Sequence, residues 1–457
     1  MNAVLSPQVF DSVSAFALDL AYVDMPSEVV VQAQRCLLDL IGVAAAGSRT
    51  TAASIANHYA STQLCGRDAQ ARMLFDGRSA SLAGAAFAGA ATLDAFDAHD
   101  GHVLTKGHAG AALLPALLAC VDGIDAAPLR YDGREFLTAL VVGYEIATRA
   151  GIALHASVAE FHCSGAWNSL GCAALASRYL ALDRKRVSHA LGIAEYLGPR
   201  GQILRVCDHP TMLKDGSAWG AHVGMTAAIL ARDGFTGAPA ITIENTHDIF
   251  GDLGERWRIN EQYFKAYPVC RWAQPAIEAA LALRRRYEFD NDDIVNVTIE
   301  SFREAIDLGS QCRYPATTDE AQYSLTWPVA CALVHGDVTV VDEALQETRG
   351  RALIDRITLR DNVEFSRRFP AERWARVSIT LADSRTLVSD PARARGNPEN
   401  PLDDEELVAK YHDLADPVVG TLRAQTIIDR VEALPRESSV LRGLIDDLLA
   451  PISARDA

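Results

Sequence analysis

The sequence lacks any block rich in lysine and arginine. Its 457 residues include 43 Lys or Arg against 59 Asp or Glu, which gives a formal net charge of −16. Binding to nucleic acid requires a basic surface that neutralises phosphates, so this composition argues against nucleic acid as a partner. Local cationic pockets are still compatible with the total charge.

Several cofactor signatures are missing. Nine cysteines are scattered through the chain without a Cys-x-x-Cys pair, which argues against a zinc ribbon, an iron–sulfur cluster and a disulfide framework. There is no Gly-x-Gly-x-x-Gly after a predicted strand and no Gly-x-x-x-x-Gly-Lys-Ser/Thr, so no cradle for a dinucleotide or triphosphate is indicated. A Gly-x-Ser-x-Gly nucleophile elbow is also missing. We expect no metal and no organic cofactor.

Membrane and export signals are weak. The Ala/Gly-rich stretch 79–93 contains little Leu, Ile or Val and is shorter than the ~20 residues that span a bilayer, so it predicts a buried helix. Residues 1–6 do not form the basic and apolar regions of a secretory signal. We therefore expect a cytoplasmic protein with no membrane partner.

The fold class predicted is mainly α. With 49% hydrophobic and 22% charged residues, the chain is typical of globular proteins, and its length exceeds the ~250–300 residues of one core. Apolar residues recur at helical spacing from residue 6 to about 250, whereas 294–302, 355–359 and 377–381 have strand character. We predict an all-helical domain over 1–264, a smaller α+β domain over 265–395, and C-terminal helices over 396–457 that return to the helical domain.

Two histidines and two carboxylates share one segment of the first domain. His102 and His108 lie close in sequence to Asp97 and Asp100, either of which could orient an imidazole or raise its basicity. This pattern suits general acid–base catalysis. A metal site and a solvated acidic loop are the alternatives, although the spacing is not that of a helical His-Glu-x-x-His motif.

Two more candidates stand just before predicted helices. His162 precedes a helix near Trp167, and Lys214 precedes a helix that starts near Ser217. Helix N-termini favour anionic ligands, so a carboxylate could bind beside either residue. A capping or core histidine and a surface lysine are the alternatives.

Cationic and aromatic residues also mark the junction of the two domains. Lys265 and Arg271 flank Tyr267 where the helical pattern gives way to the α+β pattern. Clefts between domains are preferred ligand sites, and Arg can bind a carboxylate in a bidentate manner. The alternative is a structural anchor at a domain hinge.

The order of these segments resembles the MmgE/PrpD family over nearly the whole chain. The matching segments are 36–43 with Gly47, 100–102 with 108–115, 143–145, 161–162, 190–194, 234–237, 265–275, 321–325 and 396–402. The chain departs from the family where Ala109 and Cys163 follow the histidines in place of proline, and where Trp327 stands in place of a tyrosine.

The resemblance implies an all-helical body built from both chain ends, an α+β lid and a homodimer, with the active site between body and lid. The catalytic residues that it implies are His108, His162 and Asp97, to which the sequence pattern adds His102. The substrate-binding residues that it implies are Lys214 and Lys265, to which we add Arg271, Tyr267 and Trp327. No metal ligand is implied.

The resemblance also implies a reaction. We expect a cofactor-independent hydro-lyase (a dehydratase or hydratase) that acts on a small di- or tricarboxylic acid of the 2-methylcitrate or aconitate type. A histidine would remove a proton next to a carboxylate. The alternatives are a decarboxylase or an epimerase on a related acid, and a family member that binds carboxylates without turning them over.

Overall fold

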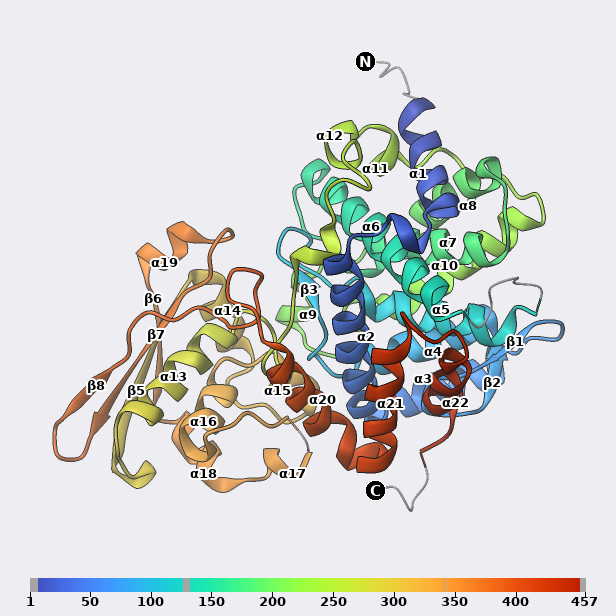
Figure 1. The fold of residues 1–457 in the computed structure, drawn as a ribbon. Helices are drawn as coiled ribbons and strands as arrows, with labels where there is room; N and C mark the ends of the chain where they lie inside the picture. Colours follow the sequence, from blue (N-terminus) through green and yellow to red (C-terminus); the bar gives the residue numbers. More distant parts are fainter. Residues whose placement is uncertain (1–6, 126–131, 341, 453–457) are drawn as a thin grey trace. The chain divides into compact units, whose positions relative to one another are not determined.

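The computed structural model describes residues 7–125, 132–340 and 342–452, so the N-terminal segment used above to argue against a signal peptide lies outside the described residues. The chain forms two compact units (Figure 1). Unit 1 takes Met1–Ile203, Lys214–Tyr263 and Asp403–Ala457, and unit 2 takes Leu204–Leu213 and Phe264–Leu402. The predicted domain boundaries lie between residues 264 and 265 and between residues 395 and 396. In the structure, the corresponding boundaries lie between residues 263 and 264 and between residues 402 and 403.

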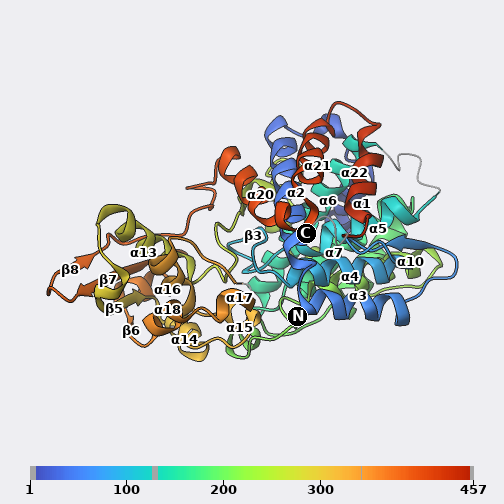
Figure 2. The same ribbon diagram turned by 90° about the horizontal axis from the view of Figure 1, so that it is seen from below.

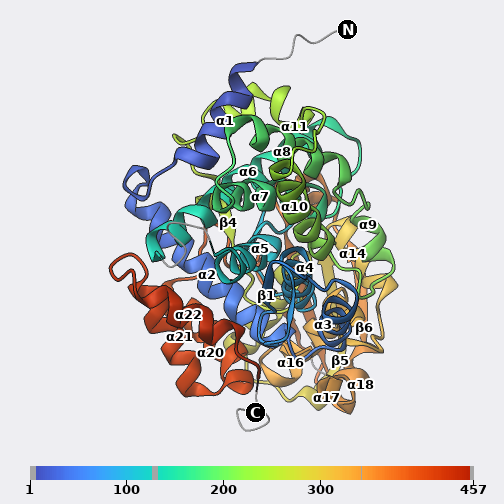
Figure 3. The same cartoon turned by 90° about the vertical axis from the view of Figure 1, so that its right-hand side faces the viewer.

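Unit 1 is a helical body, and both ends of the chain contribute to it. Its longer helices are α1 Pro7–Asp19, α2 Ser27–Gly47, α3 Thr51–Gln63, α4 Leu82–Asp94, α5 Gly110–Gly123, α6 Gly133–Ser157, α7 Gly165–Tyr179, α8 Arg184–Leu197, α10 Ser217–Arg232, α20 Asp404–Val419, α21 Thr421–Ala433 and α22 Val440–Leu449. The C-terminal helices α20 and α21 pack on α2 (Figures 1 and 3). The tail thus rejoins the helical body.

Short elements complete unit 1. They are α11 Ile241–Glu244, α12 His247–Phe250, the 3₁₀ turns η1 Tyr22–Asp24 and η2 Arg258–Glu261, and the strand pairs β1 Gln70–Arg72 with β2 Ser79–Ser81 and β3 Gly101–His102 with β4 Gln262–Tyr263. The predicted helix over 79–93 is observed as α4, preceded by β2.

Small residues allow the central helices of unit 1 to approach closely. A Cβ on Gly171 of α7 would lie 2.6 Å from the Gly143 carbonyl oxygen of α6, and one on Gly224 of α10 would lie 2.5 Å from the Ser169 carbonyl oxygen of α7. Any larger side chain would push these helices apart. The helices α2 and α6 are long and apolar enough to cross a membrane, but 72% and 94% of their most apolar windows are buried inside the protein.

Unit 2 is the α+β part of the chain. Its elements are α9 Leu204–Asp208, α13 Gln274–Arg286, η3 Asn291–Asp293, β5 Ile294–Ser301, α14 Arg303–Gln311, α15 Thr318–Gln322, α16 Thr326–His335, α17 Asp342–Leu345, α18 Thr348–Ile354, β6 Ile357–Asp361, α19 Val363–Arg368, β7 Ala375–Leu381 and β8 Thr386–Val388. The four strands form one mixed sheet in the order β6-β5-β7-β8 (Figure 2).

The register of this sheet follows its alternating sequence. Strand β5 runs parallel to β6, with Val297 opposite Ile357, and antiparallel to β7, with Val297 opposite Ile379. Every second residue of β7 is buried, and α13 packs against this strand. The sheet therefore buries the face that α13 covers.

One segment differs from the predicted organisation. Helix α9 belongs to unit 2, although its residues lie inside the predicted all-helical domain 1–264. The reason is apolar packing, since Val206 and Cys207 form a core cluster with Leu308 and Tyr323 of unit 2. No pattern in the sequence indicates that α9 packs in unit 2 while the segments on either side of it belong to unit 1.

Candidate functional site

A buried group of two imidazoles and a carboxylate forms the centre of the candidate site in unit 1. One ligand-type atom from each of Asp97, His99 and His108 lies within 4.8 Å of the others. All three side chains are buried, and the rings of His99 and His108 are 4.1 Å apart between centroids. We call these residues the histidine cluster.

His108 is held from three sides. Its ring Nδ1 lies 2.5 Å from the carbonyl oxygen of Asp100, and its Nε2 lies 3.3 Å from Oδ2 of Asp215. Its backbone N–H donates to Oγ of Ser164 at 2.9 Å. Both ring nitrogens face oxygen acceptors, an arrangement that suits a doubly protonated ring able to donate a proton.

A second aspartate stands beside His99. Oδ1 of Asp94, at the end of α4, lies 3.5 Å from Nε2 of His99, and its Oδ2 accepts from the backbone N–H of Ser217 at 2.8 Å. Burial raises the pKa of Asp94 to about 6, and the Ser217 N–H and the charge of His108 only partly oppose this. A carboxyl with a pKa of about 6 is readily protonated and deprotonated, which suits a group that stores or passes a proton.

The loop that carries Asp97 and His99 is held by hydrogen bonds from residues outside the histidine cluster. The hydroxyl of Tyr144 donates to Oδ2 of Asp100 at 2.7 Å. Nζ of Lys410, on the C-terminal helix α20, donates to the carbonyl oxygen of Ala98 at 2.7 Å and to Oδ1 of the buried Asp39 at 2.5 Å. Lys410 thus anchors the loop between Asp97 and His99.

Lys214 lies directly before Asp215, the partner of His108. Its side chain is buried and its backbone is left-handed, with a φ of 47°, a conformation that costs a non-glycine residue about 1 kcal/mol. Gly216 follows with a φ of 68°. Two left-handed residues so close together turn the chain sharply into α10 and place Asp215 at the histidine cluster.

His162 occupies a neighbouring loop and is partly exposed. Its Nδ1 lies 3.2 Å from the carbonyl oxygen of Arg200, and its backbone N–H donates to Nε2 of His155 at 3.1 Å. Burial lowers the pKa of His155 to about 4, with the nearby His162 acting in the same direction. Ser164, two residues along, contacts His108, so the structure brings the two predicted histidine loops together.

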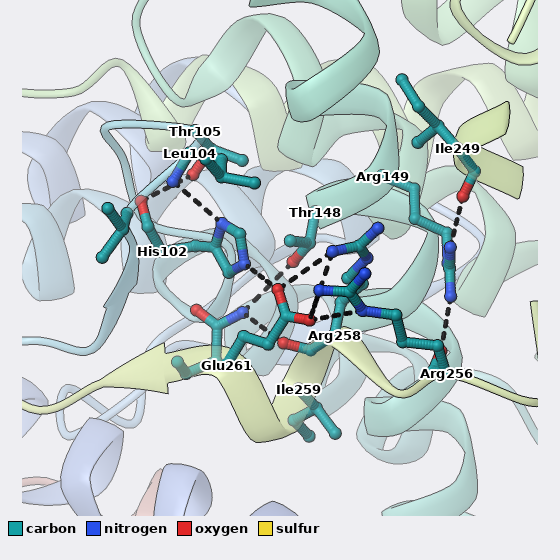
Figure 4. A network of polar contacts seen from close by, with 12 residues as sticks. His102, Leu104, Thr105, Thr148, Arg149, Ile249, Arg256, Arg258, Ile259 and Glu261 are labelled. Atoms are coloured by element: carbon teal, nitrogen blue, oxygen red, sulfur yellow. Dashed lines mark hydrogen bonds and ion pairs between the residues drawn. The ribbon is translucent and has the colours of Figure 1, made fainter. Parts of the chain in front are cut away.

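His102 belongs to a separate polar network (Figure 4). Its Nε2 lies 3.0 Å from Oε2 of Glu261, and its Nδ1 accepts from the backbone N–H of Leu104 at 3.3 Å. Burial lowers the pKa of His102. Burial would also raise the pKa of Glu261, but hydrogen bonds from His102 and from Arg256 and Arg258 outweigh it and bring that pKa to about 2. This geometry fits a neutral His102 that donates to an ionised Glu261, and the arrangement favours a positioning role.

The remaining predicted residues belong to unit 2 and are described within it. Lys265 and Tyr267 are buried, and the hydroxyl of Tyr267 donates to Oε1 of Glu278 at 2.9 Å. Arg271 donates to the carbonyl oxygen of Arg395 at 2.7 Å and also bonds Oδ1 of Asn397. Arg271 therefore anchors the turn that ends unit 2, and its contact with a substrate stays a prediction.

Trp327 is also a core residue of unit 2. It is 1% exposed, its indole N–H donates to the carbonyl oxygen of Thr339 at 3.2 Å, and its ring lies against Gly350. This packing fixes the ring firmly. Its predicted contact with substrate stays a prediction.

The donor types of the histidine cluster are those that a divalent transition metal would take. His108 would offer Nε2, since its Nδ1 bonds a backbone carbonyl in the way that metal-ligating histidines do. Asp97 and His99 would complete a three-residue set. The expectation of a metal-free site stays a prediction, which chelation of the purified protein would test.

Sequence reasoning missed three members of this site. His99 was visible in the Asp-x-His pattern that starts at Asp97, and two-residue spacing was a usable signal. Asp94 lies at the end of an apolar helix and Asp215 lies beside Lys214, and neither has a local pattern that points to a histidine. Only the folded chain brings them to His99 and His108.

Comparisons with known proteins agree with this architecture. The model of the MmgE/PrpD N-terminal domain matches residues 11–252, and that of the MmgE/PrpD C-terminal domain matches residues 267–435. A cis-aconitate decarboxylase-like protein of Aspergillus oryzae is 25% identical over 94% of this chain and 94% of its own. The cis-aconitate decarboxylases of Aspergillus terreus and Homo sapiens are 23% and 24% identical, over 98% and 92% of this chain and 97% and 91% of their own. The two domain models together span most of the sequence, and the chain belongs to the MmgE/PrpD family.

Proposed function

We propose that this protein is a lyase that acts on a small di- or tricarboxylic acid of the cis-aconitate type. The observation that supports the proposal most is the histidine cluster, whose two buried imidazoles each face an aspartate outside the cluster, Asp94 for His99 and Asp215 for His108. Such groups can deliver or remove a proton inside a site that excludes water. The relatives named cis-aconitate decarboxylase favour the substrate class.

Decarboxylation is the first candidate reaction because of these relatives, whereas the expectation drawn from the family resemblance put dehydration first. The carbon–carbon bond to one carboxylate breaks, carbon dioxide leaves, and the electron pair remains on the substrate carbon or its conjugated double bond. A proton from the His108 imidazolium then adds to that carbon. Asp215 stabilises the imidazolium before transfer and would help to reload it from water afterwards.

Dehydration is kept as a second candidate because each imidazole of the histidine cluster has its own carboxylate neighbour, Asp94 for His99 and Asp215 for His108. Elimination of water needs a base that takes the proton next to a carboxylate and an acid that protonates the departing hydroxyl. One of His99 and His108 could act as base and the other as acid. His162, from the adjacent loop, is an alternative second proton carrier.

The substrate carboxylates need cations, since Asp97 belongs to the histidine cluster and Asp94 and Asp215 lie beside it. Lys214 of unit 1 is the nearest candidate in sequence, and Lys265 and Arg271 of unit 2 are the others. Preorganised cations of this kind stabilise the negative charge that develops on the reacting carbon. We also propose a cytoplasmic homodimer that works without a metal or organic cofactor.

The test is a panel of di- and tricarboxylates, including cis-aconitate, followed by NMR with the purified protein. Release of carbon dioxide with a new alkene product supports decarboxylation, whereas gain or loss of water alone supports a hydro-lyase. Retention of activity after exhaustive chelation supports the metal-free mechanism. No conversion of any acid on the panel would contradict the proposal.

A further inference from the structure

Unit 2 holds a cavity of about 350 Å³ between the end of α13 and the segment 388–400. This volume is within the range of about 300–1,000 Å³ that is typical of small-molecule sites. Four arginines line it, and we call it the arginine cavity: Arg285, Arg286, Arg393 and Arg395. None of the lining residues belongs to the histidine cluster.

The charge of the arginine cavity is opposite to that of the whole chain. Its two acidic lining residues are Glu278 and Asp390, so the lining carries a net charge of +4 − 2 = +2, whereas the protein carries −16. Asp390 is 93% exposed and stands 3.8 Å from Arg286, a surface pair that stabilises little. Arg393 bonds Glu399, whose side chain is 48% exposed.

The helix dipole accounts for only part of this cluster. Arg285 and Arg286 end α13, where cations stabilise the partial negative charge of the helix C-terminus. Arg393 and Arg395 come from a different segment and reach the same cavity. Two segments that are separate in the sequence therefore bring guanidinium groups to the same cavity.

Two lining residues of the cavity, Glu278 and Arg395, are bonded to predicted substrate-binding residues. The buried Glu278 accepts from the hydroxyl of Tyr267 at 2.9 Å and from Nε of Arg395 at 3.1 Å. The carbonyl oxygen of Arg395 accepts from Arg271 at 2.7 Å. An anion that drew the Arg395 side chain toward the cavity would compete with Glu278, the carboxylate that also accepts from Tyr267.

We propose that the arginine cavity binds a small polyanion that carries phosphate or carboxylate groups. Guanidinium forks bind either group with two parallel hydrogen bonds, and several forks around one cavity select multiply charged ligands. This site is distinct from the histidine cluster, and its occupancy does not depend on which reaction the protein catalyses.

The test is calorimetric titration of the full-length protein at low salt, with inorganic phosphate in one arm and citrate in the other. Arg285→Gln/Arg393→Gln should weaken phosphate binding about tenfold or more. Arg367→Gln changes an exposed arginine of α19 outside the cavity, so it should bind as the unmodified protein does. The tighter arm identifies phosphate or carboxylate as the preferred group.

A second variant separates the loss of anion binding from a loss of fold. Arg393 also stacks on the ring of Trp374, so its replacement removes a packing contact. If the first variant has a lower melting temperature than the unmodified protein, Arg285→Gln/Arg286→Gln, which changes two exposed residues, repeats the test. Citrate bound at the histidine cluster would add a binding event that these variants leave intact. If the variants bound phosphate and citrate as tightly as the unmodified protein does, the binding would be that of an adventitious ion only, and the proposal would be overturned. The absence of saturable binding in both arms would also overturn it.

Discussion

The imidazole of His108 lies between a backbone carbonyl and a carboxylate, and this position determines what the ring can do. The contact from Nδ1 to Asp100 fixes the ring orientation, while Nε2 faces Asp215. A proton on Nε2 is therefore stabilised until a substrate carbon competes for it. His99 stands against the same ring, and its Nε2 lies 3.5 Å from Oδ1 of Asp94.

His99 should matter as much as the histidines that the sequence pattern picked out. His99→Asn removes the second imidazole–carboxylate pair, so kcat on the preferred acid should fall about 100-fold or more, as expected for loss of a general acid or base. Steady-state kinetics measure this. His58→Asn changes an exposed histidine of α3 and should leave kcat unchanged. A normal kcat in His99→Asn would exclude this residue from proton transfer.

Asp94 should leave a signature in the pH dependence of stability. Its pKa is 3.8 when unfolded and about 6 when folded, so the folded state holds the proton more tightly. The stability that this group contributes is present at low pH and is lost as the pH rises from about 4 to about 6.

Asp94→Asn keeps an oxygen for the Ser217 N–H but cannot ionise. Relative to the unmodified protein, it should gain at most about 3 kcal/mol in free energy of unfolding between pH 4 and pH 7. Urea unfolding at both pH values measures this difference. A constant difference across the range would mean that Asp94 has an ordinary pKa.

At the scale of elements, the C-terminal helix α20 completes the site from the opposite end of the chain. Lys410 on this helix bridges Asp39 of α2 and the carbonyl oxygen of Ala98. Asp39 is fully buried and the Lys410 side chain is 12% exposed. This bridge ties the loop of the histidine cluster to the chain tail.

Lys410→Met should cost about 3 kcal/mol in free energy of unfolding, because it leaves a buried carboxylate without this cation. Asp39→Asn in the same protein should recover part of that stability but not the catalytic rate, since Ala98 still lacks its donor. Denaturant titration and kinetics of the single and double variants separate the two effects. Full recovery of the rate in the double variant would show that Lys410 does not position the loop.

The elements differ in how well their sequence predicts them. The helix predicted over 79–93 and the helix start predicted near Ser217 agree with α4 and α10, because apolar residues at helical spacing mark both segments. The strands β1 to β4 have two or three residues each, too few for an alternating pattern. The site divides in the same way: His108 and Asp97 lie in a recognisable segment, whereas Asp215 and Lys410 reach it only through tertiary packing.

At the scale of the whole molecule, the predicted cations are divided between the two units. Lys214 is in unit 1, and Lys265 and Arg271 are in unit 2. We predict that each of these cations binds a carboxylate of the substrate.

Lys265→Gln should therefore raise KM for the preferred acid about tenfold, since one carboxylate loses a cationic partner. Lys185→Gln, on an exposed position of α8, is the matched control and should leave KM unchanged. Initial-rate measurements over a range of substrate concentrations decide this. An unchanged KM in Lys265→Gln would exclude Lys265 from substrate binding.

The molar mass of the protein in solution tests the predicted homodimer. Light scattering coupled to size-exclusion chromatography should give twice the 49.3 kDa of one chain. The mass should stay constant on dilution through the micromolar range if the interface is permanent. A mass of one chain at all concentrations would contradict the prediction.

The central claim is that His108 transfers a proton to or from a substrate carbon next to a carboxylate. The most direct test is NMR of cis-aconitate incubated with the protein in deuterated water. Our account predicts that deuterium enters the product carbon and that His108→Gln, with an intact fold, abolishes this incorporation. Deuterium incorporation at an unchanged rate in His108→Gln would contradict the account.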